Sequence, residues 1–197
     1  MATKSFRIRW CLTALILPAL ASLSCSKSSS NGSTTLTPDQ FGQRYKFADN
    51  EISGWQQAAG TDRFLVCTSA ELEDPSNPNP IDGAAPAYTD NGMTMVMFQY
   101  LAGPGSNACQ VRAMDFGTDA SATAMFAQEQ KSTASDIAIA AFDTSTAIAY
   151  SVISGITVYA HFKASYFELY LTGFGTDQNA ASQAATQFLQ VLQAKTK

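Results

Sequence analysis

Two segments of the chain repeat the same order of hydrophobic and polar residues. In each, two alternating runs joined by a short turn lead into the residues FGTD, at 116–119 and at 174–177, and then into an alanine-rich stretch. The runs are MTMVMFQYL and ACQVRAMDF in the first copy, and ITVYAHFK and YFELYLTGF in the second. Such alternation predicts paired antiparallel strands, and Gly-Thr-Asp predicts a tight turn into a capped helix. We therefore expect two hairpin-then-helix units, with a further strand at residues 147–153.

The two helices that follow FGTD each present an apolar stripe. The last helix is expected from about residue 177 to 194, with a stripe formed by Ala181, Ala184, Ala185, Phe188, Val191 and Leu192. The earlier helix offers Ala122, Met125 and Phe126 at similar spacing. Because an apolar stripe is buried against another layer, the expected fold is α+β: an antiparallel sheet with the helices packed on one face.

The second hairpin assigns its side chains to two faces of the sheet. A core face is expected for Ile156, Val158, Ala160, Phe162, Phe167, Leu169 and Leu171. The opposite face holds a candidate binding surface, formed by Tyr159, His161, Tyr166 and Tyr170. Aromatic side chains with polar tips suit contacts with a sugar or a protein. Two other interpretations remain: another layer of the domain covers this face, or it is an ordinary solvated face.

The N-terminal residues have the layout of a secretory signal. Lys4, Arg7 and Arg9 precede an uncharged run, Cys11–Leu23, which is shorter than the ~20 residues of a membrane span. Small residues follow the run, so residues 1–24 are predicted to be a signal peptide and are set apart from the fold. Ala19-Leu20-Ala21 offers ordinary signal peptidase an alternative site.

The end of this signal, Ser22-Leu23-Ser24-Cys25, resembles the lipobox of bacterial lipoprotein precursors, although leucine is usual at the position of Ser22. The resemblance implies that Cys25 becomes the first residue and receives diacylglycerol and a fatty acyl group such as palmitate. Two or more acyl chains give stable anchoring. Residues 25–37 would then be a serine-rich tether, and residues 38–197 one domain. The implied location is the bacterial cell envelope, at the outer membrane where the cell has one, because Ser26 differs from the aspartate that marks inner-membrane retention.

Composition narrows the classes of partner. The chain from Cys25 has 173 residues (197 minus 24), and it keeps nine of the twelve basic residues and all sixteen acidic ones, a net charge of −7 (9 minus 16). With no basic stripe, nucleic acid is not expected as a partner. The expected partners are the membrane, through the lipid anchor, and an envelope protein or glycan.

Two cysteines, Cys67 and Cys109, remain in the domain. In an oxidising compartment they are expected to form a disulfide, while two buried thiols are the alternative. One histidine and no CxxC motif give no basis for a metal site or a redox role, so no metal or cofactor is expected.

A second resemblance involves Ile81-Asp82-Gly83-x-Ala85-x-x-Tyr88, with Trp55 before it and Gly92 after it. It is similar to an I-(D/N)-G-x-A-x-x-Y segment in a family of bacterial exported domains with no established activity. Membership would cover residues ~50–195 and imply an α+β fold. Asp82, next to glycine in a proline-rich loop, is a candidate loop site. The alternative is that Asp82 caps a short helix.

The sequence favours binding over catalysis. His161 is the single histidine, and no G-x-S-x-G segment accompanies it. No residue is therefore assigned a catalytic role, and we expect a non-catalytic binding or accessory module at the membrane surface. The alternative is an enzyme that hydrolyses envelope polymers with a pair of carboxylates.

Overall fold

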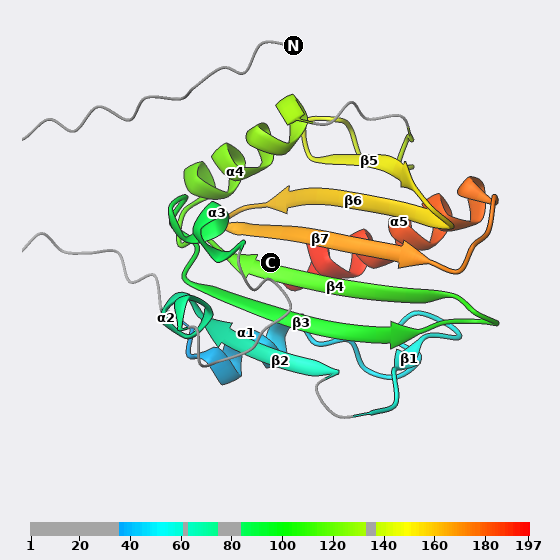
Figure 1. Ribbon diagram of the computed structural model, residues 1–197, viewed down its shortest axis with the longest axis horizontal. Helices are drawn as coiled ribbons and strands as arrows, with labels where there is room; N and C mark the ends of the chain where they lie inside the picture. Colours follow the sequence, from blue (N-terminus) through cyan, green and yellow to red (C-terminus); the bar gives the residue numbers. More distant parts are fainter. Residues whose placement is uncertain (1–35, 61–62, 75–83, 133–136) are drawn as a thin grey trace, which may run out of the picture. The chain divides into compact units, whose positions relative to one another are not determined.

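The computed structural model describes residues 36–60, 63–74, 84–132 and 137–197 (Figure 1). Residues from Thr35 to Lys197 group as one compact unit. Its elements are α1 (Pro38–Tyr45), β1 (Gln56–Gln57), β2 (Phe64–Thr68), α2 (Ser69–Glu73), α3 (Ala85–Thr89), β3 (Met95–Ala102), β4 (Ala108–Asp115), α4 (Asp119–Ser132), β5 (Ala147–Val152), β6 (Gly155–Phe162), β7 (Ser165–Thr172) and α5 (Gln178–Lys195).

The strands form one antiparallel sheet, in the order β1-β3-β4-β7-β6-β5, with β2 also paired to β3. β4 and β7 lie side by side at the centre, where the two predicted hairpins meet. The predicted α+β class is confirmed. The two hairpin-then-helix units are confirmed as well, as β3–β4–α4 and β6–β7–α5.

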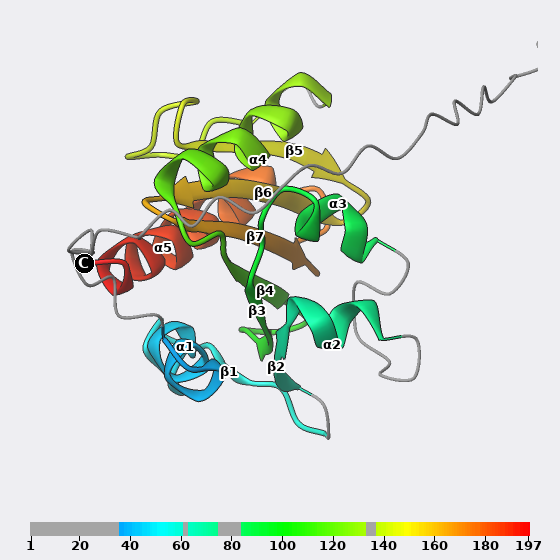
Figure 2. The ribbon, with the colours of Figure 1, turned by 90° about the vertical axis from the view of Figure 1, so that its left-hand side faces the viewer.

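One detail of the expected packing is wrong: the helices cover both faces of the sheet. α5 and α1 bury Phe188, Leu192 and Phe41 against the inward residues of the strands, on what we call the α5 face. α4 buries Ala122, Met125 and Phe126 on the opposite side, the α4 face. Figure 2 shows α1 and α5 on one side of the sheet, and α2 and α3 on the other.

A single backbone difference within the repeat accounts for the two faces. Phe116 belongs to the cluster on the α4 face, whereas Phe174 packs against the cluster on the α5 face. The residue before Phe116 is Asp115, which ends β4 in extended conformation, but the residue before Phe174 is Gly173, with a φ of 87°. Glycine adopts this left-handed conformation readily. A Cβ at this glycine would lie 2.2 Å from the Ser106 carbonyl oxygen, so the reversal depends on glycine.

The FGTD segments start their helices with different caps. In the first copy, the Thr118 hydroxyl accepts a hydrogen bond from the backbone N–H of Ser121 at 3.1 Å. In the second, the Asp177 carboxylate accepts one from the N–H of Ala180 at 2.9 Å. Either side chain satisfies an N–H that the first helical turn leaves unpaired, so the same four residues begin helices one position apart.

A two-residue turn sets the register of the second hairpin. Its turn is formed by Lys163 and Ala164, so His161 lies opposite Tyr166 and Glu168 lies opposite Tyr159. Lys163 has a φ of 54°, a left-handed value of the kind that two-residue hairpin turns require. Ser165 stays in the strand because its buried hydroxyl is hydrogen-bonded to the Tyr45 hydroxyl at 2.7 Å. A turn one residue later, at Ala164 and Ser165, would instead place His161 opposite Glu168, and this pair is not formed.

The expected disulfide is also wrong, since both cysteines are free and buried. Cys67 lies on β2 in the α4-face cluster, and Cys109 lies on β4 in the α5-face cluster. β3 separates the two strands, which alone sets the backbones about 10 Å apart. A disulfide needs Cα atoms within about 7 Å and side chains that point toward each other.

Among the described residues, no helix combines the length and the apolarity that a membrane crossing requires.

The two thiols should be unreactive in the folded protein and reactive after unfolding. Burial raises the pKa of Cys67 to about 11, with a smaller contribution from Glu71, and burial raises the pKa of Cys109 as well. In a chain that starts at residue 25 and carries Cys25→Ser, iodoacetamide at pH 8 should leave both thiols unmodified, because little thiolate forms. Unfolding without reductant should then give two alkyl groups by intact mass. If reductant were needed for that alkylation, a disulfide would be present after all.

Candidate functional site

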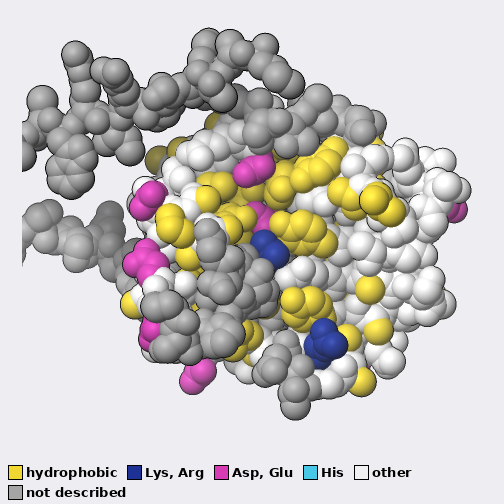
Figure 3. All heavy atoms as spheres, viewed as in Figure 1, with side chains coloured by type: hydrophobic (Ala, Val, Ile, Leu, Met, Phe, Trp, Pro, Cys, Tyr) yellow, Lys and Arg dark blue, Asp and Glu magenta, His cyan; other side chains and the backbone are white. Residues whose placement is uncertain are grey.

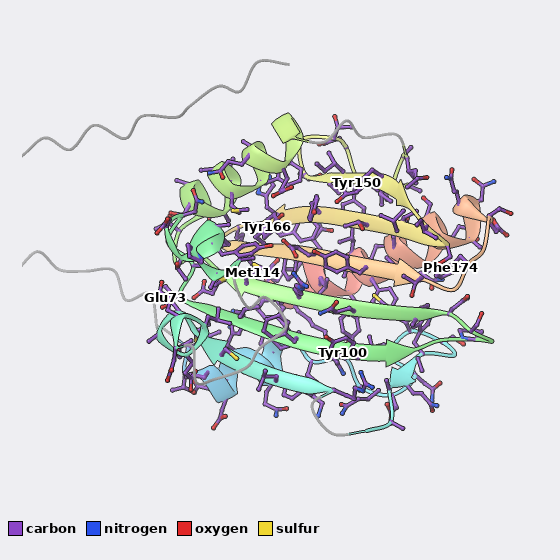
Figure 4. The ribbon with its side chains drawn as sticks, viewed as in Figure 1. Glu73, Tyr100, Met114, Tyr150, Tyr166 and Phe174 are labelled. Carbon is purple, nitrogen blue, oxygen red and sulfur yellow. The ribbon has the colours of Figure 1, made fainter. Side chains whose placement is uncertain are left out.

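The side chains of the α4 face form rows that cross the strands. The register aligns one row as Tyr100, Gln110, Tyr170, Thr157 and Tyr150, which we call the tyrosine row. The neighbouring row, two residues along each strand, consists of Phe98, Arg112, Glu168, Tyr159 and Ile148, and we call it the Glu168 row. Figure 4 shows Tyr100 on β3, Tyr166 on β7 and Tyr150 on β5 along this face.

Glu168 is the most buried charge of this face, with 1% of its surface exposed. Its carboxylate accepts hydrogen bonds from the Tyr88 hydroxyl at 2.8 Å, the Tyr170 hydroxyl at 2.8 Å, and Nη1 of Arg112 at 3.1 Å. The donors come from α3, β7 and β4, so the carboxylate joins three elements far apart in the sequence. A buried charge is tolerated when it is paired and hydrogen-bonded in this way.

Arg112 is held between Glu168 and two aromatic rings. Its guanidinium lies 4.7 Å from the centre of the Tyr170 ring and 5.9 Å from that of Phe98. Burial lowers the pKa of Arg112, but the carboxylate of Glu168 and the neighbouring tyrosines raise it by more, so the net pKa lies above its ordinary value. The side chain is 13% exposed, and its Nε is buried without a hydrogen-bond partner among the described residues.

The tyrosines around Glu168 stay protonated and act as hydrogen-bond donors. Burial, followed by the charge of Glu168, raises the pKa of Tyr88 and of Tyr170. Burial also raises the pKa of Tyr159, whose hydroxyl lies 3.0 Å from that of Tyr150. A phenol with a raised pKa is a poor base near neutral pH. The arrangement therefore supplies fixed donors and aromatic surface rather than a proton acceptor.

Of the four residues expected on the binding face, two lie in the core. Tyr166 is 0% and Tyr159 8% exposed, because α4 and α3 cover this end of the face. His161 is partly exposed, with its ring 4.8 Å from that of Phe126 and its Nε2 atom 2.9 Å from the Ser145 carbonyl oxygen. Of these four, Tyr170 alone lies toward the end of the face that no described helix covers, which we call the uncovered end, and Tyr100 and Tyr150 are also partly exposed there.

A hollow of about 350 Å³ lies at this uncovered end, along the tyrosine row. Gln110 donates from Nε2 to the Tyr100 hydroxyl at 3.0 Å, and the Arg63 guanidinium lies 5.3 Å from the centre of the Tyr100 ring. Among the described residues, the remaining lining consists of Ala58, Leu101, Ala102, Ala108, Cys109, Tyr170 and Thr172, without an acidic side chain. Figure 3 shows this face, with hydrophobic side chains gathered over the strands and acidic ones mainly toward one edge.

Two of the residues singled out from the sequence, Cys25 and Asp82, lie outside the described residues. Within the described part of the chain, no group of His, Cys, Asp and Glu has an arrangement that could hold a metal ion.

The chain was compared with protein-family models, curated proteins and solved structures. No protein-family model matches it, and no curated protein matches it significantly. Among solved structures, the extracellular domain of PknH from Mycobacterium tuberculosis matches with a TM-score of 0.48 and 14% identity, over 82% of this chain and 99% of that one. A likeness of this size defines neither the fold nor a function of this chain.

Sequence reasoning missed the residues that organise the site. Arg112 is the one charged residue inside the otherwise uncharged run ACQVRAM, and such a charge in a central strand calls for an acidic partner on the same face. The sequence therefore indicates a buried ion pair, and Glu168 on the second hairpin is the acid that matches. The contribution of Tyr88 and Tyr100 was not readable, because it depends on how α3 and β3 are placed against β7.

Replacing both members of the Arg112–Glu168 ion pair should destabilise the fold by less than the two single replacements suggest. Arg112→Met alone should lower the free energy of unfolding by about 3–5 kcal/mol, because Glu168 is left buried without its cation. Arg112→Met combined with Glu168→Gln should cost less than the sum of the single changes. Urea unfolding of the four proteins forms the double-mutant cycle. Additive costs would mean that the two charges do not stabilise each other.

Proposed function

We propose that this chain is an exported, lipid-anchored binding module that uses the uncovered end of the α4 face. The observation that supports this most is the tyrosine row beside the hollow. Tyr170 is fixed by Glu168 and Arg112, and Tyr100 is fixed by Gln110. Aromatic rings held in place by buried polar groups lose little freedom when a ligand binds, which favours recognition.

The same contacts disfavour catalysis by carboxylates. General acid or nucleophilic chemistry needs a carboxyl group that is free to approach the substrate, with a second one about 5–10 Å away. Both oxygens of Glu168 are already hydrogen-bonded, and the side chain is 1% exposed. The described lining of the hollow offers no second acid. The geometry therefore supports binding better than hydrolysis of an envelope polymer.

The anchor rests on the sequence alone. A basic start, an uncharged run, Ser24-Cys25 and a serine-rich stretch are the features that support it. A flexible Ser/Gly-rich tether lets an anchored domain sample the space above a membrane. An anchored module of this kind would hold its ligand close to the envelope.

Cys25→Ala should release the protein from membranes. The acyl chains are the proposed source of attachment, and the rest of the chain has a net charge that gives no attraction to anionic lipids. Fractionation of the expressing bacteria should move the protein from the membrane pellet to the soluble fraction. Ser28→Ala, in the tether, is the matched control and should leave it in the pellet. Retention of the Cys25→Ala protein in the pellet after a high-salt wash would refute the anchor.

Tyr100→Ala should weaken binding to the isolated envelope. A chain that starts at residue 25 with Cys25→Ser would be mixed with purified envelope fragments and sedimented. The substitution should lower the bound fraction, with an apparent affinity about tenfold weaker, as expected for one lost aromatic contact. The control is Ile153→Ser, which changes a side chain that is 95% exposed in the β5–β6 turn. Equal sedimentation of both variants and the parent would contradict the proposed binding face.

A further inference from the structure

The tyrosine row has a spacing that points to a class of ligand. Tyr100 lies on β3 and Tyr170 on β7, with β4 between them. Tyr170 and Tyr150 are likewise two strands apart, with β6 between them. Adjacent strands are about 4.8 Å apart, so the three rings recur about every 10 Å across the sheet.

From this spacing we propose that the tyrosine row binds an extended polymer of β-1,4-linked pyranose sugars, which lies across the strands. This rests on the proposed binding role of the α4 face and names its ligand. In such a polymer every second ring presents the same face in the same direction, and the repeat of two rings is close to two strand spacings. One polymer could therefore place like faces of alternate rings over Tyr100, Tyr170 and Tyr150.

The chemistry of the row fits a sugar ring. A pyranose has an apolar face of C–H groups and a rim of hydroxyls, so it combines aromatic contact with hydrogen bonding at its edge. The tyrosines are partly exposed, and Gln110 between the first two is partly exposed as well. Thr157, between the second and third, is 2% exposed and serves as a spacer in the row. The small side chains of Ala102 and Ala108 beside Tyr100 and Gln110 leave room for a ring at the floor of the hollow.

Charge fits the same ligand. Among the described residues that line the hollow, Arg63 supplies a positive charge and no acidic side chain opposes it. Arg112 and Glu168 in the neighbouring row form an ion pair at 3.1 Å. A neutral glycan, or one that bears carboxylates, meets no like charge here. A basic peptide would meet Arg63 without a compensating acid.

The direction of the row favours a glycan over an extended peptide as the ligand. Extended peptides bind by adding to the edge of a sheet, where backbone groups are free. The tyrosine row instead crosses the face of the sheet from β3 to β5, perpendicular to the strands. A ligand that follows this row contacts side chains and no free backbone groups. An extended glycan can bind in this way, because its sugar rings contact aromatic side chains.

Oligosaccharides of defined length and linkage test the proposal. The probes are the β-1,4-linked hexamer and dimer of N-acetylglucosamine, with maltohexaose as the α-linked control, titrated calorimetrically into the chain from residue 25 with Cys25→Ser. The hexamer should bind at least tenfold more tightly than the dimer, because it spans more than one tyrosine. Maltohexaose should not bind measurably. Equal affinity for hexamer and dimer, or binding of maltohexaose, would overturn the proposed geometry.

Variants link the binding to the row. Tyr100→Ala and Tyr150→Ala should each weaken hexamer binding by about tenfold, while Tyr100→Phe, which keeps the ring, should stay within about threefold. Ile153→Ser is the control outside the row and should bind as the parent does. Thermal unfolding of each variant shows whether it is folded. If Tyr100→Ala does not fold, Tyr150→Ala and Tyr100→Phe still test the row. An equal loss in Ile153→Ser would overturn the assignment of the row.

The experiments distinguish a wrong ligand from a wrong binding face. If no β-linked hexamer binds but Tyr100→Ala still reduces sedimentation with the envelope, the glycan is wrong and the binding face stands. Protease treatment of the envelope that abolishes this sedimentation would assign a protein ligand and also overturn the glycan. If Tyr100→Ala has no effect in either experiment, both proposals fail.

Discussion

A buried carboxylate sets the arrangement of the α4 face. Glu168 lies in a central strand with 1% of its surface exposed, so the fold must surround it with donors. Arg112 on β4 and Tyr88 on α3 meet this need from two other elements. The requirement fixes the pairing of the two hairpins, the position of α3 and the orientation of the Tyr170 ring. The three hydrogen bonds that Glu168 accepts join α3, β4 and β7 at this point.

The two hairpin-then-helix units show how a repeated sequence can fold into a non-repeated packing. The strands and the FGTD segments correspond, yet Asp115 and Gly173 give the chain different directions as it leaves β4 and β7. As a result α4 and α5 both contact β6 and β7, from opposite faces. Helices contact the second hairpin from both faces, whereas Tyr100 of the first hairpin and Tyr170 of the second stay partly exposed at the end of the α4 face that no described helix covers.

That unequal coverage produces the surface that we propose for binding. α4 and the short helices cover one end of the α4 face and leave the tyrosine row at the other, so aromatic side chains that would otherwise enter the core remain partly exposed. Tyr100 and Tyr150 are on this row, and the Glu168 row beside it holds the buried ion pair. A binding module would gain from such an arrangement, because aromatic rings held by buried polar groups lose little freedom when a ligand binds.

The sequence by itself determined the strands, the capped helix starts, the α+β class and the alternation that puts Val158 and Leu169 in the core. These follow from local patterns, since side chains alternate along a strand and helices bury one stripe. The tertiary structure decided the face that each helix covers, the turn at Lys163, the separation of Cys67 from Cys109, and the partners of Glu168. Each of these depends on backbone direction at single residues or on contacts between distant strands, which no local pattern encodes.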